Sequence, residues 1–89
     1  MNKEFMLAQV RYRIKQLEVE YRKYFDLDDG PSKSVSGAAC IRSRIMKDLG
    51  ILHLIDYLLM YCPDDMVIES ETVCKAFDRL TEPRKLHNN

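Results

Sequence analysis

Apolar side chains in the first 25 residues recur at alternating steps of three and four. Such heptad spacing is typical of a helix that packs lengthwise against another helix, as in a coiled coil. Because neither glycine nor proline interrupts it, the pattern predicts one long helix from Lys3 to about Phe25. The apolar positions of this helix are Leu7, Val10, Ile14, Leu17, Tyr21 and Tyr24.

The same predicted helix carries a second apolar set, Phe5, Tyr12 and Val19, at steps of seven on the opposite face. A surface helix usually has one apolar stripe and a polar back. Two explanations remain open: the second set contacts a partner, or later helices pack on both sides of this helix. If a partner binds, we expect Arg11 and Arg13 at the rim, because aromatic residues and arginine dominate interface energetics.

Two further segments are expected to be helical before residue 63. Residues 26–36 collect aspartate, glycine, proline and serine, which form turns. Apolar side chains then recur at helical spacing as far as Leu49, and Gly50 follows where a helix C-terminal glycine is expected. The pattern predicts a second helix over about residues 36–49, with its basic side chains outward.

Residues 51–61 are too uniformly apolar for an amphipathic surface helix, so they are predicted to form the buried central helix, ended by Pro63. A short apolar run is also compatible with a strand, although its length and its leucine and methionine content favour a helix. A further helix is predicted after Ser70, a good N-cap residue. Its apolar positions are Val73, Phe77 and Leu80.

These elements predict an all-α fold, a small array of about four helices with a long N-terminal helix. Residues 1–82 are expected to form a single domain, and residues 83–89 a polar C-terminal tail. A chain of 89 residues buries little more than about 60% of its unfolded surface, so its stability margin is thin. A second copy of the chain is one usual supplement to so small a core.

Charge and cysteine content exclude several classes of protein. Fourteen basic and fourteen acidic residues give a net charge of zero, which offers no overall attraction to nucleic acid or to an anionic membrane. The most apolar run is also much shorter than the roughly 20 residues of a membrane-spanning helix. Three cysteines without a CxxC pair argue against a secreted disulfide framework. We therefore expect a soluble, cytoplasmic protein.

The stretch DGPSKSVSG, residues 29–37, superficially resembles a phosphate-binding loop. It lacks the glycine before the lysine, and it follows a predicted helix rather than a strand, so we interpret it as a connector. A weaker alternative is an anion site at the start of the second helix, or phosphorylation of Ser32, Ser34 or Ser36.

No metal site or catalytic centre is expected. Cys40, His53, Cys62 and Cys74 lie too far apart along the chain to include the close ligand pair of a structural zinc site. His53 and Asp56 lie one helical turn apart, but such pairs arise by chance, and a chain this short has little room for a substrate pocket. We expect no cofactor, no small-molecule substrate and no enzymatic activity.

Binding to nucleic acid is the alternative from a different class. The segment after Gly50 presents apolar side chains, so it cannot be the recognition helix of a helix-turn-helix motif. A basic surface on the first two helices remains a candidate for phosphate contacts. The residues proposed for such an anion or nucleic-acid contact are Lys33, Arg42, Arg44 and Lys47.

The favoured hypothesis is a non-enzymatic protein-interaction module that acts as a regulator, inhibitor, adaptor or chaperone. Its partner would be another protein or a second copy of the chain, docked helix on helix against the long N-terminal helix. The residues expected to carry this contact are Phe5, Tyr12 and Val19, with Arg11 and Arg13.

Overall fold

The computed structural model of the protein describes residues 1–27 and 37–82, and the side chains of residues 25–27 and 37–39 are not described. These residues form three helices, α1 (Lys3–Leu27), α2 (Gly37–Met60) and α3 (Glu71–Thr81), and no strand. The all-α prediction is confirmed at this level. The prediction of about four helices is not, because two of the predicted helices are one.

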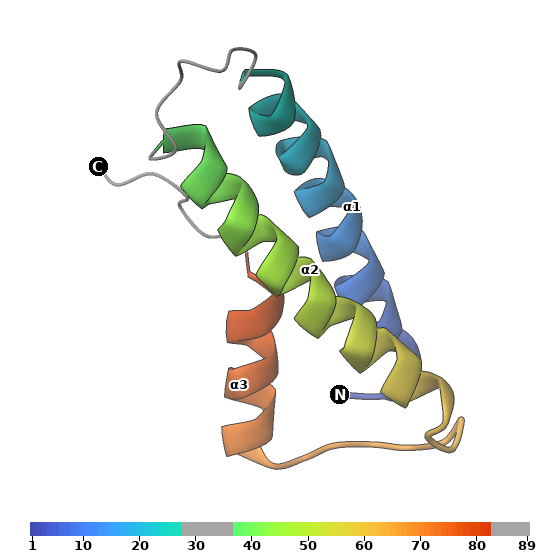
Figure 1. The fold of residues 1–89 in the computed structure, drawn as a ribbon. Coiled ribbons are helices and arrows are strands. Elements are labelled where there is room, and N and C mark those ends of the chain that lie inside the picture. Colours follow the sequence, from blue (N-terminus) through green and yellow to red (C-terminus); the bar gives the residue numbers. More distant parts are fainter. Residues whose placement is uncertain (28–36, 83–89) are drawn as a thin grey trace.

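The two long helices lie side by side and antiparallel, and the C-terminal end of the shorter α3 lies beside the middle of α2 (Figure 1). Helix α1 begins after Asn2, whose side-chain Oδ1 accepts a hydrogen bond of 2.8 Å from the backbone N–H of Phe5. Glu4 lies in the first turn, where a negative charge is favourable to the helix dipole. These two features stabilise the N-terminal end of α1, which lies near the C-terminal end of α2.

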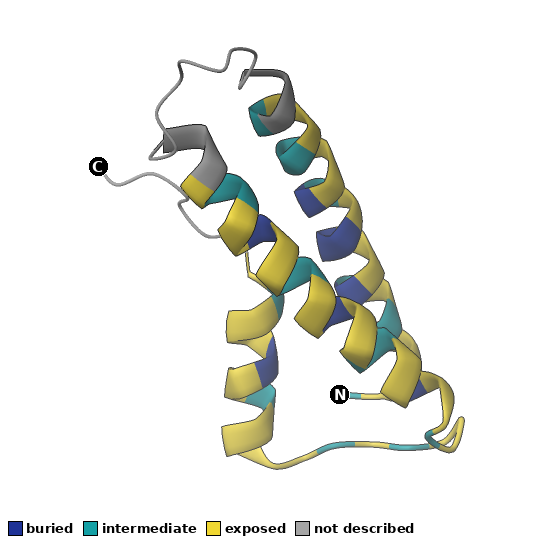
Figure 2. Cartoon of the chain, in the orientation of Figure 1, coloured by how far each residue is buried: buried dark blue, intermediate teal, exposed yellow. Residues whose placement is uncertain are grey.

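The core is the seam between α1 and α2, where buried residues line the facing sides of the two helices (Figure 2). From α1 come three positions of the predicted heptad, Val10, Ile14 and Leu17, and Met6 joins them. From α2 come Ile45, Leu52 and Leu59, which are seven residues apart. The predicted apolar seam of α1 is therefore confirmed, with Leu7, Tyr21 and Tyr24 half-buried beside it.

Gly50 does not end a helix, and the prediction of a helix boundary there was wrong. Helix α2 runs without a break through this residue, and no described glycine has a positive φ. Glycine costs about 1 kcal/mol relative to alanine inside a helix but keeps its backbone hydrogen bonds. Strong helix formers around it, and the packing of Ile45 and Leu52 against α1, outweigh that cost.

The prediction that residues 51–61 form a buried central helix was half wrong. The segment is helical, but only Leu52 and Leu59 within it are buried. The physical reason is the number of neighbours: α1 covers one side of α2 along its length, and the eleven-residue α3 is too short to cover the rest. Ile55 is half-buried beside the core, and the other apolar side chains of this segment are exposed.

Helix α3 begins as predicted, because the side chain of Ser70 accepts a hydrogen bond from the backbone N–H of Val73. Phe77 is its buried residue and packs into the core beside α1. Upstream, Val67 pairs with Asn2 in an isolated antiparallel bridge. Lys3 adds a second tie, because its Nζ donates to the carbonyl of Cys62 at 2.8 Å and to Asp64 at 3.0 Å.

Some predictions concern residues outside the described part of the chain. They are the DGPSKSVSG connector before Gly37, with its candidate phosphorylation sites, and the C-terminal tail of residues 83–89. Among the described residues, no helix has the length and apolar content needed to cross a membrane.

Candidate protein-interaction face

The side of α2 that faces away from α1 carries the largest group of exposed apolar side chains in the described chain. Leu54, Tyr57 and Leu58 expose 57%, 59% and 54% of their surface, and Tyr61, just past the end of the helix, exposes 73%. Ile51 exposes less and borders α3. We call this surface the open face of α2, defined by Lys47, Gly50, Ile51, Leu54, Tyr57, Leu58 and Tyr61.

The open face has the spacing of a helix-packing seam. Lys47, Leu54 and Tyr61 follow one another at steps of seven along its middle. Residues seven apart lie on the same side of a helix. The same step relates Gly50 to Tyr57 on one flank of this seam and Ile51 to Leu58 on the other. The buried seam of α2 has the same period. Helix α2 therefore carries two lengthwise seams, of which α1 covers only one.

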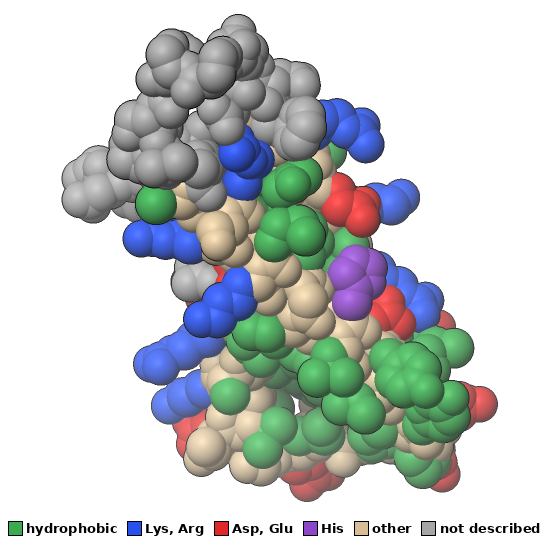
Figure 3. Space-filling view, viewed as in Figure 1, with side chains coloured by type: hydrophobic (Ala, Val, Ile, Leu, Met, Phe, Trp, Pro, Cys, Tyr) green, Lys and Arg blue, Asp and Glu red, His purple; other side chains and the backbone are tan. Residues whose placement is uncertain are grey.

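Helix α3 borders this face and forms a groove with α2. The groove has a volume of about 600 Å³ and is lined by Asp48, Ile51, Leu52, Ala76, Arg79 and Leu80. Val73 and Leu80 of α3 each remain 44% exposed. In Figure 3, apolar side chains gather over the C-terminal half of α2 and towards α3, and basic side chains lie along both edges of this view. Such an apolar patch with a charged rim is typical of an interaction site.

Two tyrosines at the C-terminal end of the face support each other. The ring centroids of Tyr57 and Tyr61 are 5.1 Å apart in an edge-to-face arrangement, and their hydroxyl oxygens are 3.3 Å apart. This hydrogen bond, with burial as a smaller cause, raises the pKa of Tyr61 above its ordinary value. Tyrosine combines an apolar ring with a polar tip, and it is enriched at protein interfaces for that reason.

Arg11, expected at the rim of an interface, is instead tied to the neighbouring helix. Its Nε and Nη2 atoms donate to the two carboxylate oxygens of Asp56, both at 3.0 Å, and Nη2 also lies 3.3 Å from the sulfur of Met60. The hydrogen bond from Arg11 is the largest cause of the lowered pKa of Asp56, and the charge of His53 lowers it further. Arg11 thus joins α1 to α2 beside the open face.

The second predicted rim residue, Arg13, does not lie on the exposed face, and this prediction was wrong. It is 6% exposed, and its Nη1 donates to Oε1 of Gln16 at 3.3 Å. The reason is its register, because Arg13 directly precedes Ile14 on the side of α1 that turns towards the core. The long side chain can bury its stem and still hydrogen-bond its head.

The predicted apolar set on α1 lies on the surface. Phe5, Tyr12 and Val19 expose 47%, 64% and 61% of their surface. No other described helix covers them, because α2 packs on the opposite side of α1. They lie seven residues, about two helical turns, apart, whereas the apolar residues of the open face of α2 adjoin one another. The α1 set is therefore the smaller of two uncovered apolar surfaces.

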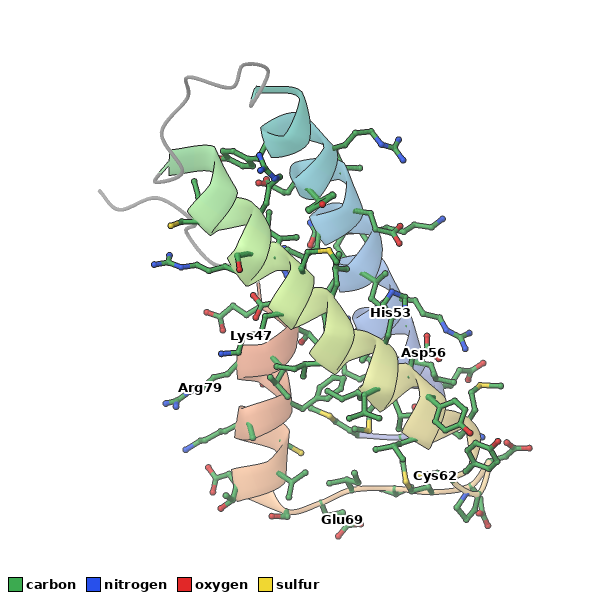
Figure 4. All side chains as sticks on the ribbon, in the orientation of Figure 1. Lys47, His53, Asp56, Cys62, Glu69 and Arg79 are labelled. Carbon is green, nitrogen blue, oxygen red and sulfur yellow. The ribbon has the colours of Figure 1, made fainter. Side chains whose placement is uncertain are left out.

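The four residues proposed for anion or nucleic-acid contact do not form one surface. Lys33 lies outside the described residues. Arg42 donates from Nη1 to the backbone carbonyl of Tyr24 at 3.1 Å and so links the two long helices. Arg44 and Lys47 are exposed on α2, and in Figure 4 Lys47 extends from the same side of the molecule as Arg79 of α3.

The candidate metal and nucleophile residues are dispersed. Cys40 is exposed on α2, while Cys62 and Cys74 are half-buried, and none of the three is in a disulfide. The sulfurs of the half-buried pair lie near different backbone carbonyls, those of Leu58 and Ile68. Within the described ranges, no three histidine, cysteine, aspartate or glutamate side chains are grouped so as to hold a metal ion.

Sequence reasoning missed the open face of α2. The run of apolar residues from Ile51 onward suggested that every side of this segment is buried, so no exposed apolar face was expected on it. One signal was present: the step of seven that joins Lys47, Leu54 and Tyr61 repeats the step that joins Ile45, Leu52 and Leu59. Two offset heptads on one helix indicate two packing partners.

Comparison with known proteins found no matching family model, no similar curated protein and no similar solved structure. The class of the protein therefore follows from its own geometry: an antiparallel helical hairpin with a short third helix and an uncovered apolar seam.

Proposed function

We propose that this protein is a small, non-enzymatic interaction module, of the regulator, inhibitor, adaptor or chaperone type, that binds protein through the open face of α2. The single observation that carries the proposal is the seam of adjoining, mostly exposed apolar side chains at Leu54, Tyr57, Leu58 and Tyr61. Exposed single apolar residues need no explanation, but a contiguous group with helix-packing spacing marks an interface.

The energetics support the same proposal. Full burial of one large apolar side chain is worth about 1.5–3 kcal/mol relative to its exposure. The described residues bury only eight apolar side chains, so the exposed seam is a substantial share of the apolar surface that this chain has to bury. A helix laid along the seam would bury it by the helix-in-groove mode of recognition, with α3 as one wall.

The proposal places the protein in the cytoplasm, where its three cysteines would stay reduced. It assigns no reaction and no cofactor to the chain. The groove between α2 and α3 is lined mostly by aliphatic side chains, which suits contact with another apolar surface.

The test is the native mass of the protein in an extract of the cells that make it, at moderate salt. The variant Leu54→Glu with Leu58→Lys makes the face polar, keeps the net charge, and places an acid four residues before a base, which favours the helix. We expect the wild-type protein in a complex heavier than the 10.5 kDa chain, and the variant mostly at the mass of the chain alone.

The matched control is Tyr12→Glu with Val19→Lys, which changes the exposed apolar set of α1 in the same way. The proposal predicts that the control variant stays in the complex, and that both variants keep the wild-type far-UV circular dichroism. If only the control variant is lost from the complex, the interface lies on α1 instead of α2. A wild-type protein that runs at 10.5 kDa in the extract would contradict the proposed function.

The alternative, a nucleic-acid-associated regulator, is favoured by one observation. Arg44, Lys47 and Arg79 are exposed and have no ion-pair partner within residues 1–27 and 37–82. Salt distinguishes the two functions, because phosphate contacts weaken steeply as salt increases, whereas an apolar helix interface does not. A complex that contains nucleic acid and dissociates as the salt concentration rises from about 50 to 200 mM would support the alternative.

A further inference from the structure

We infer that the partner of the open face of α2 is the same face of a second copy of the chain, with the two α2 helices antiparallel about a twofold axis beside Leu54. The inference rests on the proposed function, because it identifies the partner of that same face. It follows from the order of residues along the seam, from the charges at its two ends and from Gly50.

The order of residues along the seam makes it complementary to the same seam of a second copy that runs in the opposite direction. In an antiparallel pair centred on Leu54, a residue of one copy lies opposite a residue of the other copy when the mean of their two residue numbers is about 54. Ile51 then meets the second copy's Leu58, and Leu54 meets its equivalent, so apolar side chains contact apolar side chains. Lys47 meets the second copy's Tyr61, whose ring face attracts a cation. An isologous interface requires self-complementarity of this kind.

The charges at the two ends select the antiparallel direction. Arg44 and Lys47 lie at the N-terminal end of the seam, and Asp64 and Asp65 lie in the turn after its C-terminal end. Antiparallel packing places Arg44 next to the second copy's Asp65, twice in each dimer. Parallel packing would instead set basic against basic and acidic against acidic. Within the described chain Arg44 and Asp65 have no partner of their own, so both are free for this contact.

Gly50 supports the same register. A Cβ atom added at this position would meet nothing within 4 Å, so the fold of the single chain does not require glycine there. The residue is also exposed and costs the helix stability. In the proposed dimer Gly50 lies opposite the second copy's Tyr57, where the absence of a side chain leaves room for the aromatic ring.

The test uses the purified full chain and two charge reversals, Arg44→Glu and Asp65→Lys, in sedimentation equilibrium at low salt. We expect the wild-type chain to reach twice 10.5 kDa as its concentration increases. Each variant alone places like charges together at both ends of the dimer, so its dimer should be roughly tenfold weaker. An equal mixture restores opposite charges at both ends, and the mixed dimer should regain wild-type affinity.

A second variant tests the register without electrostatics. Gly50→Arg projects a long side chain into the space assigned to the second copy's Tyr57, and we expect it to abolish the dimer. Ala8→Arg, at an exposed position on α1, is the matched control and should leave the dimer intact. Both variants should retain the far-UV circular dichroism of the wild-type chain.

The outcomes separate this inference from the proposed function. A dimer whose affinity is not restored by mixing, or that tolerates Gly50→Arg, overturns the antiparallel arrangement. A purified chain that stays monomeric while the cell extract holds it in a complex overturns self-pairing and leaves the proposed function standing. A chain that is monomeric in both settings overturns both.

Discussion

At the scale of single residues, the pair of Arg11 and Asp56 shows how a long-range contact escapes sequence reasoning. Forty-five positions separate the two residues, and both donor–acceptor distances are 3.0 Å. Nothing local in the sequence marks one as the partner of the other. The burial of Arg13 was not predicted for a different reason. Its charge suggests the surface, but its position next to a buried isoleucine places its aliphatic stem in the core.

The lowered pKa of Asp56 predicts a pH dependence of stability. Arg11 is the main cause, and the other charged group that acts on Asp56 is His53. Because the folded pKa lies below the unfolded one, the ion pair stabilises the fold above the unfolded value of about 3.9, and this contribution is lost as the pH falls through the folded pKa. Asp56→Asn should therefore lower the free energy of unfolding at pH 7, and this loss should become smaller as the pH falls below the unfolded value.

Urea denaturation at a fixed protein concentration, followed by far-UV circular dichroism from pH 7 to pH 3, measures this effect. Glu69→Gln is the control, since Glu69 is exposed and has no ion-pair partner among the described residues. Equal losses for both variants at pH 7, or a loss for Asp56→Asn that does not become smaller between pH 7 and pH 3, would show that the ion pair does not stabilise the fold.

At the scale of elements, the long first helix could be predicted and the second could not. The seam of α1 is a regular heptad with no breaker, so pattern and structure agree. In α2, a glycine between two apolar segments has two local interpretations, a helix end or a helix interior. The choice depends on the partner helix, because α1 offers a continuous apolar surface on both sides of Gly50. Local rules contain no information about that surface.

The interior position of Gly50 predicts that Gly50→Ala stabilises the single chain by about 0.5–1 kcal/mol. Alanine restricts the unfolded chain and favours the helix, and its Cβ meets no other atom within 4 Å. The free energy of unfolding is best measured in the Leu54→Glu, Leu58→Lys background, where association does not contribute.

Ala8→Gly, at an exposed interior position of α1, is the matched control and should cost about the same amount. If Gly50→Ala were to destabilise the chain, α2 would bend or open at Gly50, and the uninterrupted helix described here would be incorrect.

At the scale of the whole molecule, the protein presents more apolar surface than the three helices of its described residues can cover. The hairpin of α1 and α2 uses one seam, and α3 covers only part of what remains. The sequence pattern favoured an uncovered apolar face on α1, because Phe5, Tyr12 and Val19 recur there at steps of seven, and it left open that later helices cover this set. The larger face, on α2, became apparent only once the structure showed how few helices surround it.

Hydroxyl-radical footprinting of the protein in its native extract tests the central claim most directly. Tyr57 and Tyr12 expose 59% and 64% of their surface in the single chain, so they should be oxidised to similar extents if no partner is bound. Tyr57 lies on the open face of α2, and Tyr12 lies on the exposed face of α1. The account predicts that Tyr57 is several-fold less oxidised than Tyr12 in the extract, and that the difference disappears in the Leu54→Glu, Leu58→Lys variant. Equal oxidation of the two tyrosines in the wild-type extract would contradict it.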